Sequence, residues 1–503
     1  MLQLLSRTSL FISLALASQI ALADVTLPNI FSNSMVLQRD QTNPVWGKAD
    51  PGETVTVTIG SQKHSTAAAA DGQWKISLDP MSVGEPKELV IKGNNEIRLT
   101  DILVGEVWVC SGQSNMQFAV RGSTDYALVA ASANYPEIRM VNFPQVGKQD
   151  PVWSHEDRKW MVCGPDTVGG FSAVGYFFAR QLYQILGVPI GMVNNAWGGS
   201  ACEAWIPRET LASDAQFAPL MERWEAMETQ FAELSAKSDR NDAQNKQLAN
   251  LRRQMTGNHR PANIYNGVLK SHLGYGIRGA IWYQGESNAG RAYQYRELFP
   301  LMISSWRKEW GQGDFPFYWV QLADFRAEKP EPADSGWAEL REAQTMTMSK
   351  LAHTGQAVII DLGEGKDIHP RNKVDVGMRL ARWALANEYE LPIAFHSPEY
   401  KSMAIDGNKA VLTFDFVGKG WRPFDVREPL GFTIAGEDKV FVNAKATLLK
   451  DGRIEVSADS VKKPASVRYG WADNPVCNMY NQEDLPLTPF RTDDWPGVTI
   501  NAK

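Results

Sequence analysis

A serine stands in a segment whose pattern would present it to a ligand. Ser114 follows an apolar run, 107–109, and the turn residue Gly112, within VWVCSGQSNMQF at 107–118. Such a run predicts a strand buried on both faces, and open α/β sheets bind ligands at the carboxyl ends of their strands. A helix starting near Asn115 would direct free N–H groups at the hydroxyl. This arrangement suits acyl transfer, and an ordinary serine N-cap is the alternative.

His369 is the candidate general base for that serine. It stands two residues after Asp367 in GEGKDIHPRNK, so in an extended loop both side chains project to the same side. A carboxylate placed there can orient the imidazole, while Pro370 and the helix-like segment after it fix its position. The chain has seven histidines. We interpret the others as surface or core residues.

Two further motifs carry groups that could stabilise negative charge. Gly199 lies in AWGGSACEAW, where paired glycines let the backbone approach a ligand and offer an N–H group. Asn288 lies in QGESN, and its side-chain amide is another candidate donor. With the N–H of Ser114, these groups form the predicted oxyanion hole. The predicted substrate-binding residues lie in the same motifs and are Gln113, Gln284 and Glu286.

Apolar strands that precede the motifs predict a parallel α/β sheet in residues 103–390. Each strand is followed by a polar or glycine-containing turn, and helical stretches alternate with the strands. The candidates are 103–110, 189–196, 279–284, 317–322 and 357–362. An insertion at about 209–258 is charged and lacks glycine as far as Met255. It predicts a projecting helical hairpin, with a solvated spacer as the alternative.

Short β-rich runs separated by turn residues flank the α/β domain. Residues 24–102 predict a small antiparallel sandwich or barrel-like module, and residues 391–503 predict a second β-rich module. Residues 1–23 are typical of a signal peptide, with Arg7 before an apolar run and an Ala-Leu-Ala cleavage pattern at 21–23. We therefore expect a bacterial protein that is periplasmic or secreted, without a membrane span in the mature chain.

Composition argues against several classes of protein. A length of 503 residues allows two to four domains, and the formal net charge of −6 indicates neither a nucleic-acid groove nor a polybasic membrane patch. The four cysteines lack the spacing of a zinc site. Cys110 and Cys202 are interpreted as buried core residues, although an oxidising compartment would allow a disulfide. We expect no metal and no cofactor, because a serine and a histidine suffice for acyl transfer.

Together these motifs resemble the sialate O-acetylesterase family within the broader SGNH hydrolases. SGNH enzymes carry, in order, a nucleophilic Ser, a Gly, an Asn and a closely spaced acid and His. This chain offers Ser114, Gly199, Asn288 and His369 in that order. RPANIYNG at 260–267 and the C-terminal VRYGWADNPVCNMYN extend the resemblance over nearly the whole mature chain.

The resemblance implies a fold, an activity and a substrate class. The fold is a three-layer, parallel-sheet SGNH hydrolase domain with flanking antiparallel β modules. The activity is removal of O-acetyl groups from a sugar or glycan through an acetyl-enzyme intermediate. O-acetylated sialic acid is the first candidate substrate, and acetyl xylan or another acetylated polysaccharide is the alternative.

Two positions depart from the wider SGNH pattern. Gln113 stands where an Asp usually precedes the nucleophile, and the common D-x-x-H spacing would place the acid at Lys366. Asp367 is therefore an inferred member of the triad, favoured because a buried acid stabilises the imidazolium best. The alternatives are a Ser-His dyad, in which a backbone carbonyl orients His369, and an acid supplied by Glu364.

Some side chains beside the motifs have two interpretations. Three tryptophans could stack on a sugar or pack under the sheet: Trp197, Trp205 and Trp282. A sialate carboxylate would suit one of four arginines, Arg121, Arg260, Arg278 and Arg291.

Two other classes of protein stay open from the residues alone. A retaining glycosidase would use a carboxylate pair such as Glu286 and Asp324, and would leave Ser114 and His369 unexplained. A noncatalytic carbohydrate-binding protein would bind sugars without turnover. The sequence makes no prediction of the oligomeric state.

Overall fold

One long strand joins the N-terminal module to the central sheet. The computed structural model describes residues 24–502, so the predicted signal peptide lies outside the described residues. Strand β7 (Glu96–Gly112) pairs antiparallel with β6 (Lys87–Lys92) in its first part. Its second part runs parallel between β10 (Ile190–Asn194) and β11 (Gly279–Tyr283). The predicted boundary at 102/103 therefore falls inside a continuous strand.

The N-terminal module consists of short antiparallel strands before β7. β2 (Asn43–Lys48) pairs with β5 (Gln73–Leu78), while β3 (Thr54–Ile59) lies between β4 (Gln62–Ala67) and β6. Every second residue of β3 is buried, which is the period of a strand with one face on a core. β1 (Val36–Gln38) runs parallel to β7 and continues the pairing into the central domain.

Parallel strands form the central sheet in the order β13, β12, β11, β7, β10, β8. β12 spans Phe317–Val320 and β8 spans Tyr135–Asn142, and β9 (Met161–Cys163) pairs antiparallel with β8 at the edge. β13 (Thr354–Ala357) ends where the predicted run 357–362 begins. Strand β8 was not predicted. Because the strands are parallel, their carboxyl ends lie along one edge of the sheet.

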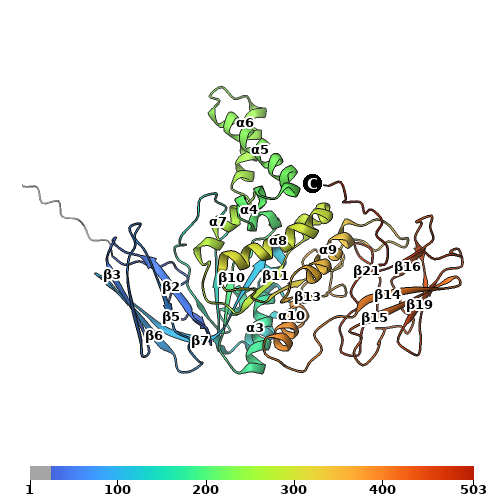
Figure 1. Cartoon of the computed structure of the whole chain (residues 1–503), viewed down its shortest axis with the longest axis horizontal. Helices are drawn as coiled ribbons and strands as arrows, with labels where there is room; N and C mark the ends of the chain where they lie inside the picture. The colour runs from blue at the N-terminus through green and yellow to red at the C-terminus, as the bar shows by residue number, and fades with distance from the viewer. Residues whose placement is uncertain (1–23, 503) are drawn as a thin grey trace, which may run out of the picture.

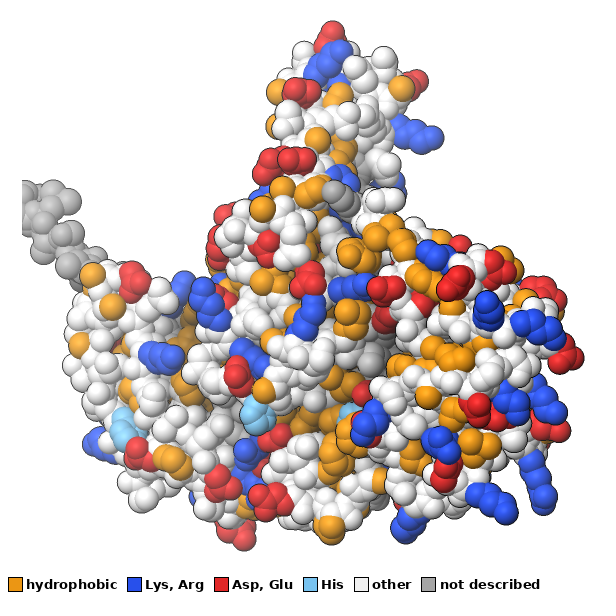
Figure 2. Space-filling model, turned by 45° about the vertical axis from the view of Figure 1, so that its right-hand side comes forward, with side chains coloured by type: hydrophobic (Ala, Val, Ile, Leu, Met, Phe, Trp, Pro, Cys, Tyr) orange, Lys and Arg blue, Asp and Glu red, His pale blue; other side chains and the backbone are white. Residues whose placement is uncertain are grey.

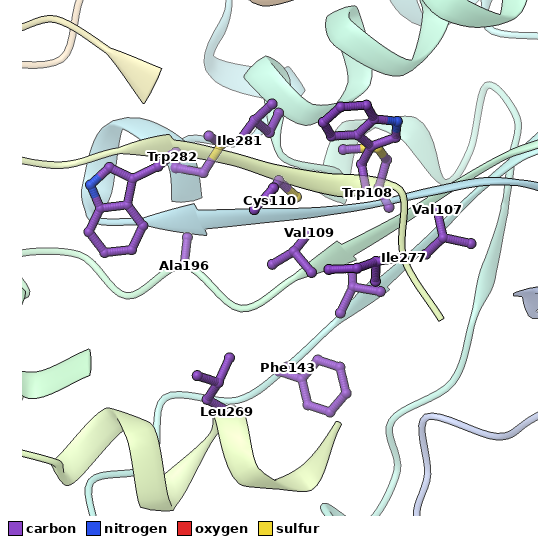
Figure 3. Close-up of a cluster of buried hydrophobic side chains, with 14 of the residues drawn as sticks. Val107, Trp108, Val109, Cys110, Phe143, Ala196, Leu269, Ile277, Ile281 and Trp282 are labelled. Carbon is purple, nitrogen blue, oxygen red and sulfur yellow. The ribbon is translucent and has the colours of Figure 1, made fainter. Parts of the chain in front are cut away.

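Helices cover both faces of this sheet, and aromatic contacts show which helix lies on which face. Trp108 of β7 packs on Phe178 of α3 (Ala173–Leu186), with ring centroids 5.1 Å apart. Trp282 of β11 packs on Phe299 of α8 (Ala292–Trp310), at 6.3 Å. Figure 3 shows Trp108 and its neighbour Val109 projecting to opposite sides of β7. α10 (Lys373–Asn387) packs beside α3, and α9 (Gly336–Lys350) beside α8.

A helical hairpin projects from the central domain (Figure 1). It is formed by α5 (Ala218–Ala236) and α6 (Asp242–Met255), after the short α4 (Arg208–Ala212). Asn241 begins α6 with a capping box, because its side chain accepts the N–H of Gln244 while Gln244 bonds back to the Asn241 backbone. Figure 2 shows acidic and basic side chains interspersed over the hairpin.

The C-terminal module contains two antiparallel sheets with a hydrophobic cluster of their own. The first has the order β14 (Glu399–Asp406), β15 (Lys409–Asp415), β19 (Ile454–Ser457), β18 (Lys445–Leu448). The second has the order β17 (Val442–Asn443), β16 (Phe432–Ala435), β20 (Ser466–Tyr469), β21 (Phe490–Arg491). The buried Arg341 of α9 ties the module to the central domain by donating to the carbonyls of Ala472 and Asp473.

The architecture confirms a mixed α/β protein with additional antiparallel sheets. In residues 24–502, no helix combines the length and the apolar character that crossing a membrane requires.

Candidate active site

Ser114 and His369 meet at the carboxyl end of the central sheet. Nε2 of His369 lies 2.8 Å from Oγ of Ser114, although the residues are 255 positions apart. Gly112 ends β7 with φ of 127°, and a Cβ there would lie 2.2 Å from the carbonyl oxygen of Tyr283, so the turn requires glycine. Ser114 then begins the short helix α1 (Ser114–Gln117) and is only half-buried, which leaves its hydroxyl within reach of a ligand.

Asp367 lies beside the imidazole on its other side. Its Oδ1 is 3.3 Å from Nδ1 of His369 and also accepts the backbone N–H of His369, at 2.9 Å. The Asp367 side chain is 57% exposed and that of His369 is 36% exposed. Glu364, the alternative acid, instead accepts the backbone N–H of Arg371 at 2.8 Å. The structure thus brings Asp367 to the histidine, but as a solvated carboxylate and not as the buried acid that was expected.

The glycine turn after β10 lies against the serine, since a Cβ on Gly198 would be 3.4 Å from Cβ of Ser114. Most N–H groups of this turn are occupied. The N–H of Trp197 donates to Gly112, that of Gly198 to the Gln117 side chain, that of Ser200 to Trp197 and that of Ala201 to Asn258. Within the described chain, the N–H of Gly199 donates to no protein group. Gly199, with φ of 71°, is therefore the residue of this turn with an N–H available to a ligand.

Asn288 belongs to a buried polar network. Its Oδ1 accepts from the backbone N–H of Cys202 (3.0 Å) and from Gln284 (2.7 Å), and its Nδ2 donates to Glu203 (3.0 Å). Burial by itself raises the pKa of Glu203, but the charge of Arg291, 2.6 Å away, and the bond from Asn288 bring that pKa below its ordinary value. Within residues 24–502, Asn288 makes no hydrogen bond to Ser114 or His369.

The two predicted substrate-binding glutamines are buried. Gln113 accepts the N–H groups of Gly285 and Ser287 at its Oε1, both at 3.4 Å. Gln284 donates to the carbonyl of Ser200 (3.0 Å) and to Asn288. Both amides connect loops of the protein, so their placement gives no support to the predicted contact with substrate.

Glu286 belongs to a second network, whose lysine the sequence analysis missed. Asn115 donates to Oε1 of Glu286 (2.8 Å) and to the carbonyl of Ile368 (2.9 Å), and accepts from Nζ of the buried Lys373 (2.6 Å). Oε2 of Glu286 is buried and has no partner among the described residues. Burial raises the pKa of Glu286 and lowers that of Lys373 to about 7. The one sequence feature that could have pointed to Lys373 is its position four residues after His369.

The other candidate side chains serve mainly inside the protein. Trp205 and Trp282 are fully buried and pack on each other with centroids 5.5 Å apart, whereas Trp197 is half-buried. Three of the arginines form ion pairs with glutamates at 2.6–2.9 Å: Arg260 with Glu228, Arg278 with Glu106, and Arg291 with Glu203. Arg121 is exposed.

A model of the family described as "carbohydrate esterase, sialic acid-specific acetylesterase" matches residues 104–237 and 256–386. The chain belongs to this family. It is therefore an esterase that hydrolyses acetyl esters, and the noncatalytic and glycosidase interpretations are wrong. The family model does not match residues 238–255, the segment that contains α6.

Individual members of the esterase family align with most of the chain. The sialate O-acetylesterase of Mus musculus is 31% identical over 422 residues, 76% of this chain and 77% of that protein. The sialate O-acetylesterase of Homo sapiens is 27% identical over 530 residues and covers 94% of each chain. A solved structure of a carbohydrate acetylesterase from Xanthomonas citri has 38% identity and a TM-score of 0.81, and covers 94% of this chain and 100% of that one.

Proposed function

We propose that this esterase removes O-acetyl groups from sugars by forming an acetyl-enzyme on Ser114, and that O-acetylated sialic acid is its preferred substrate. The observation that carries the proposal is the 2.8 Å approach of the His369 imidazole to the Ser114 hydroxyl. That distance lies within the reach that a general base needs for the proton it removes. We further propose that residues 1–23 direct export to the periplasm or beyond.

His369 acts on both halves of the reaction. It takes the Ser114 proton on Nε2 as Oγ attacks the acetyl carbonyl carbon. When the tetrahedral intermediate collapses, the bond to the sugar oxygen breaks and that proton passes to the departing hydroxyl. Water then enters, gives a proton to His369 and attacks the carbonyl carbon of the acetyl-serine. As the bond from that carbon to Oγ breaks, His369 returns the proton to Oγ, acetate leaves and the Ser114 hydroxyl is restored.

The oxyanion is stabilised by N–H groups around Ser114. The free N–H of Gly199 is the best supported donor because its neighbours in the turn are all occupied. The N–H of Ser114 is the second donor. Asn288 is the third, since its Nδ2 carries two hydrogens and Glu203 accepts one. We assign Gln113 and Gln284 to holding the site loops together.

The same features support the SGNH assignment. The four motif residues lie in the segments after β7, β10, β11 and β13, in the order of that superfamily: Ser114, Gly199, Asn288 and His369. Helices cover both faces of the sheet. We propose the three-layer SGNH arrangement for the central domain.

Acetate release by Ser114→Ala tests the proposal. The variant should lose acetate release from p-nitrophenyl acetate and from O-acetylated sialic acid, while Ser132→Ala, an exposed serine of α2 (Tyr126–Ser132), should match the wild type. Wild-type rates in Ser114→Ala would overturn the acetyl-enzyme. Comparing kcat/KM for O-acetylated sialic acids and acetylated xylo-oligosaccharides decides the substrate class, and a preference for the second group would replace sialic acid by a plant polysaccharide.

A further inference from the structure

We propose that Asn258, at the base of the helical hairpin, is a positioning residue that aims the N–H of Gly199 at the oxyanion. The inference rests on the proposed oxyanion function of Gly199. It also gives the hairpin base a function, because α6 ends at Met255, just before this residue. None of the catalytic motifs contains Asn258.

Asn258 spans the glycine turn with both its side chain and its backbone. Its Nδ2 donates to the carbonyl of Gly198 at 2.6 Å, and its own carbonyl accepts the N–H of Ala201 at 3.1 Å. The same Nδ2 lies 3.4 Å from the position that a Cβ on Gly199 would occupy. The side chain thus packs against the back of the turn that faces Ser114.

The geometry of the peptide bond explains how the hydrogen bond from Asn258 to the Gly198 carbonyl can set the direction of the Gly199 N–H. The carbonyl of Gly198 and the N–H of Gly199 belong to one planar trans peptide, in which they point in opposite directions. A donor that holds the carbonyl on one side therefore directs the N–H to the other side. Two adjacent glycines leave this unit unusually free to rotate, so the turn alone would not fix the direction of the N–H.

The next peptide of the turn is held in the same way. The carbonyl of Gly199 accepts from Nε2 of His259 (2.8 Å) and from Oγ of Ser287 (2.9 Å). The connection after α6 is itself anchored, since Asn263 donates to the carbonyls of Met255 (2.9 Å) and Gly257 (2.7 Å). Both peptides flanking Gly199 are therefore fixed from the hairpin base.

The test compares Asn258→Ala and Asn258→Asp with the wild type. Asp has the shape of Asn but cannot donate to the Gly198 carbonyl when ionised. We expect kcat to fall roughly 100-fold, as for the loss of one oxyanion donor, with KM unchanged within about twofold. The loss should be equal for p-nitrophenyl acetate and for an acetylated sugar, because both esters develop the same oxyanion.

Asn250→Ala is the matched control, since Asn250 is exposed on α6 and should leave kcat unchanged. Circular dichroism confirms folding, and if Asn258→Ala does not fold, the isosteric Asn258→Asp decides. Two results overturn the inference: a kcat within threefold of the wild type, or a loss confined to KM for the sugar ester, which would make Asn258 a substrate contact. Either result with an inactive Ser114→Ala leaves the acetyl-enzyme proposal standing, whereas an active Ser114→Ala removes the basis of both.

Discussion

Replacing Asp367 by Asn should reduce kcat/KM only about tenfold. The carboxylate oxygen lies 3.3 Å from Nδ1 of His369, so Coulomb's law gives about 1.3 kcal/mol in a water-like dielectric. A water-like value applies because the Asp367 side chain is 57% exposed, and exposed ion pairs contribute little. That energy, if it were lost from the imidazolium formed in the transition state, corresponds to a factor of roughly ten.

The substitution should leave the orientation of the histidine intact. Oδ1 of Asp367, the oxygen nearest to Nδ1, also accepts the backbone N–H of His369 at 2.9 Å. An Asn therefore keeps its oxygen, and not its NH₂ group, on the imidazole side. The tautomer with hydrogen on Nδ1 is retained, which is the form that leaves Nε2 free to accept the Ser114 proton.

Initial rates with p-nitrophenyl acetate measure the effect. His369→Ala gives the loss of the base itself and should fall at least 100-fold, since general-base catalysis contributes on the order of 10²–10⁴. Glu364→Gln is the control and should stay within twofold of the wild type, because Glu364 binds Arg371 and not the histidine. A loss near 10⁴ in Asp367→Asn, typical of a buried triad acid, would refute the reasoning from exposure. No loss at all would show that His369 works in a dyad.

The buried groups His272, Cys202 and Asn288 should respond to pH, to alkylation and to substitution, respectively. Burial lowers the pKa of His272 to about 3, so unfolding takes up a proton below pH 6.5. The free energy of unfolding should therefore decrease as the pH is lowered from 6.5 to about 3. His272→Phe should reduce the slope of that free energy against pH, measured by urea titrations, by up to about 1.4 kcal/mol per pH unit. Burial raises the pKa of the Cys202 thiol, so iodoacetamide should label it only after unfolding; labelling of the native enzyme, detected by mass spectrometry, would contradict this. Asn288→Ala should lower kcat roughly 100-fold, and steady-state rates equal to those of the wild type would remove Asn288 from the oxyanion hole.

Most of the central strands could be predicted because their signals are local. The apolar runs of β10, β11 and β12 are continuous, as expected for strands covered on both faces. β8 was missed because Arg139 interrupts its apolar run. Arg139 is nevertheless buried, since Asp101 and the carbonyl of Ser34 accept its hydrogen bonds. A local sequence pattern cannot predict hydrogen-bond partners that lie this far away in the chain.

The same limit explains the outcome at the active site. The order of Ser114, Gly199 and His369 carries enough information to predict the meeting of the serine and the histidine. The sequence pattern predicts no role for Lys373, and lysine is a residue type that is rarely buried without partners. Its amino group is buried where Asn115 accepts its hydrogen bond and the rings of Phe118 and Tyr283 lie about 5 Å away.

The site combines the half-buried pair of Ser114 and His369 with a buried polar network, and the two parts differ in how strongly they should respond to substitution. The Ser114–His369 pair is reached by solvent, so a neighbouring charge such as Asp367 has a modest effect. The buried amide of Asn115 instead joins α1 to Glu286 and to the carbonyl of Ile368, the residue before His369. Removing one partner of a buried hydrogen-bonded network leaves the other groups unsatisfied, which costs more free energy than the bond contributed. We therefore expect the distance between Ser114 and His369 to depend more on Asn115 and Lys373 than on Asp367.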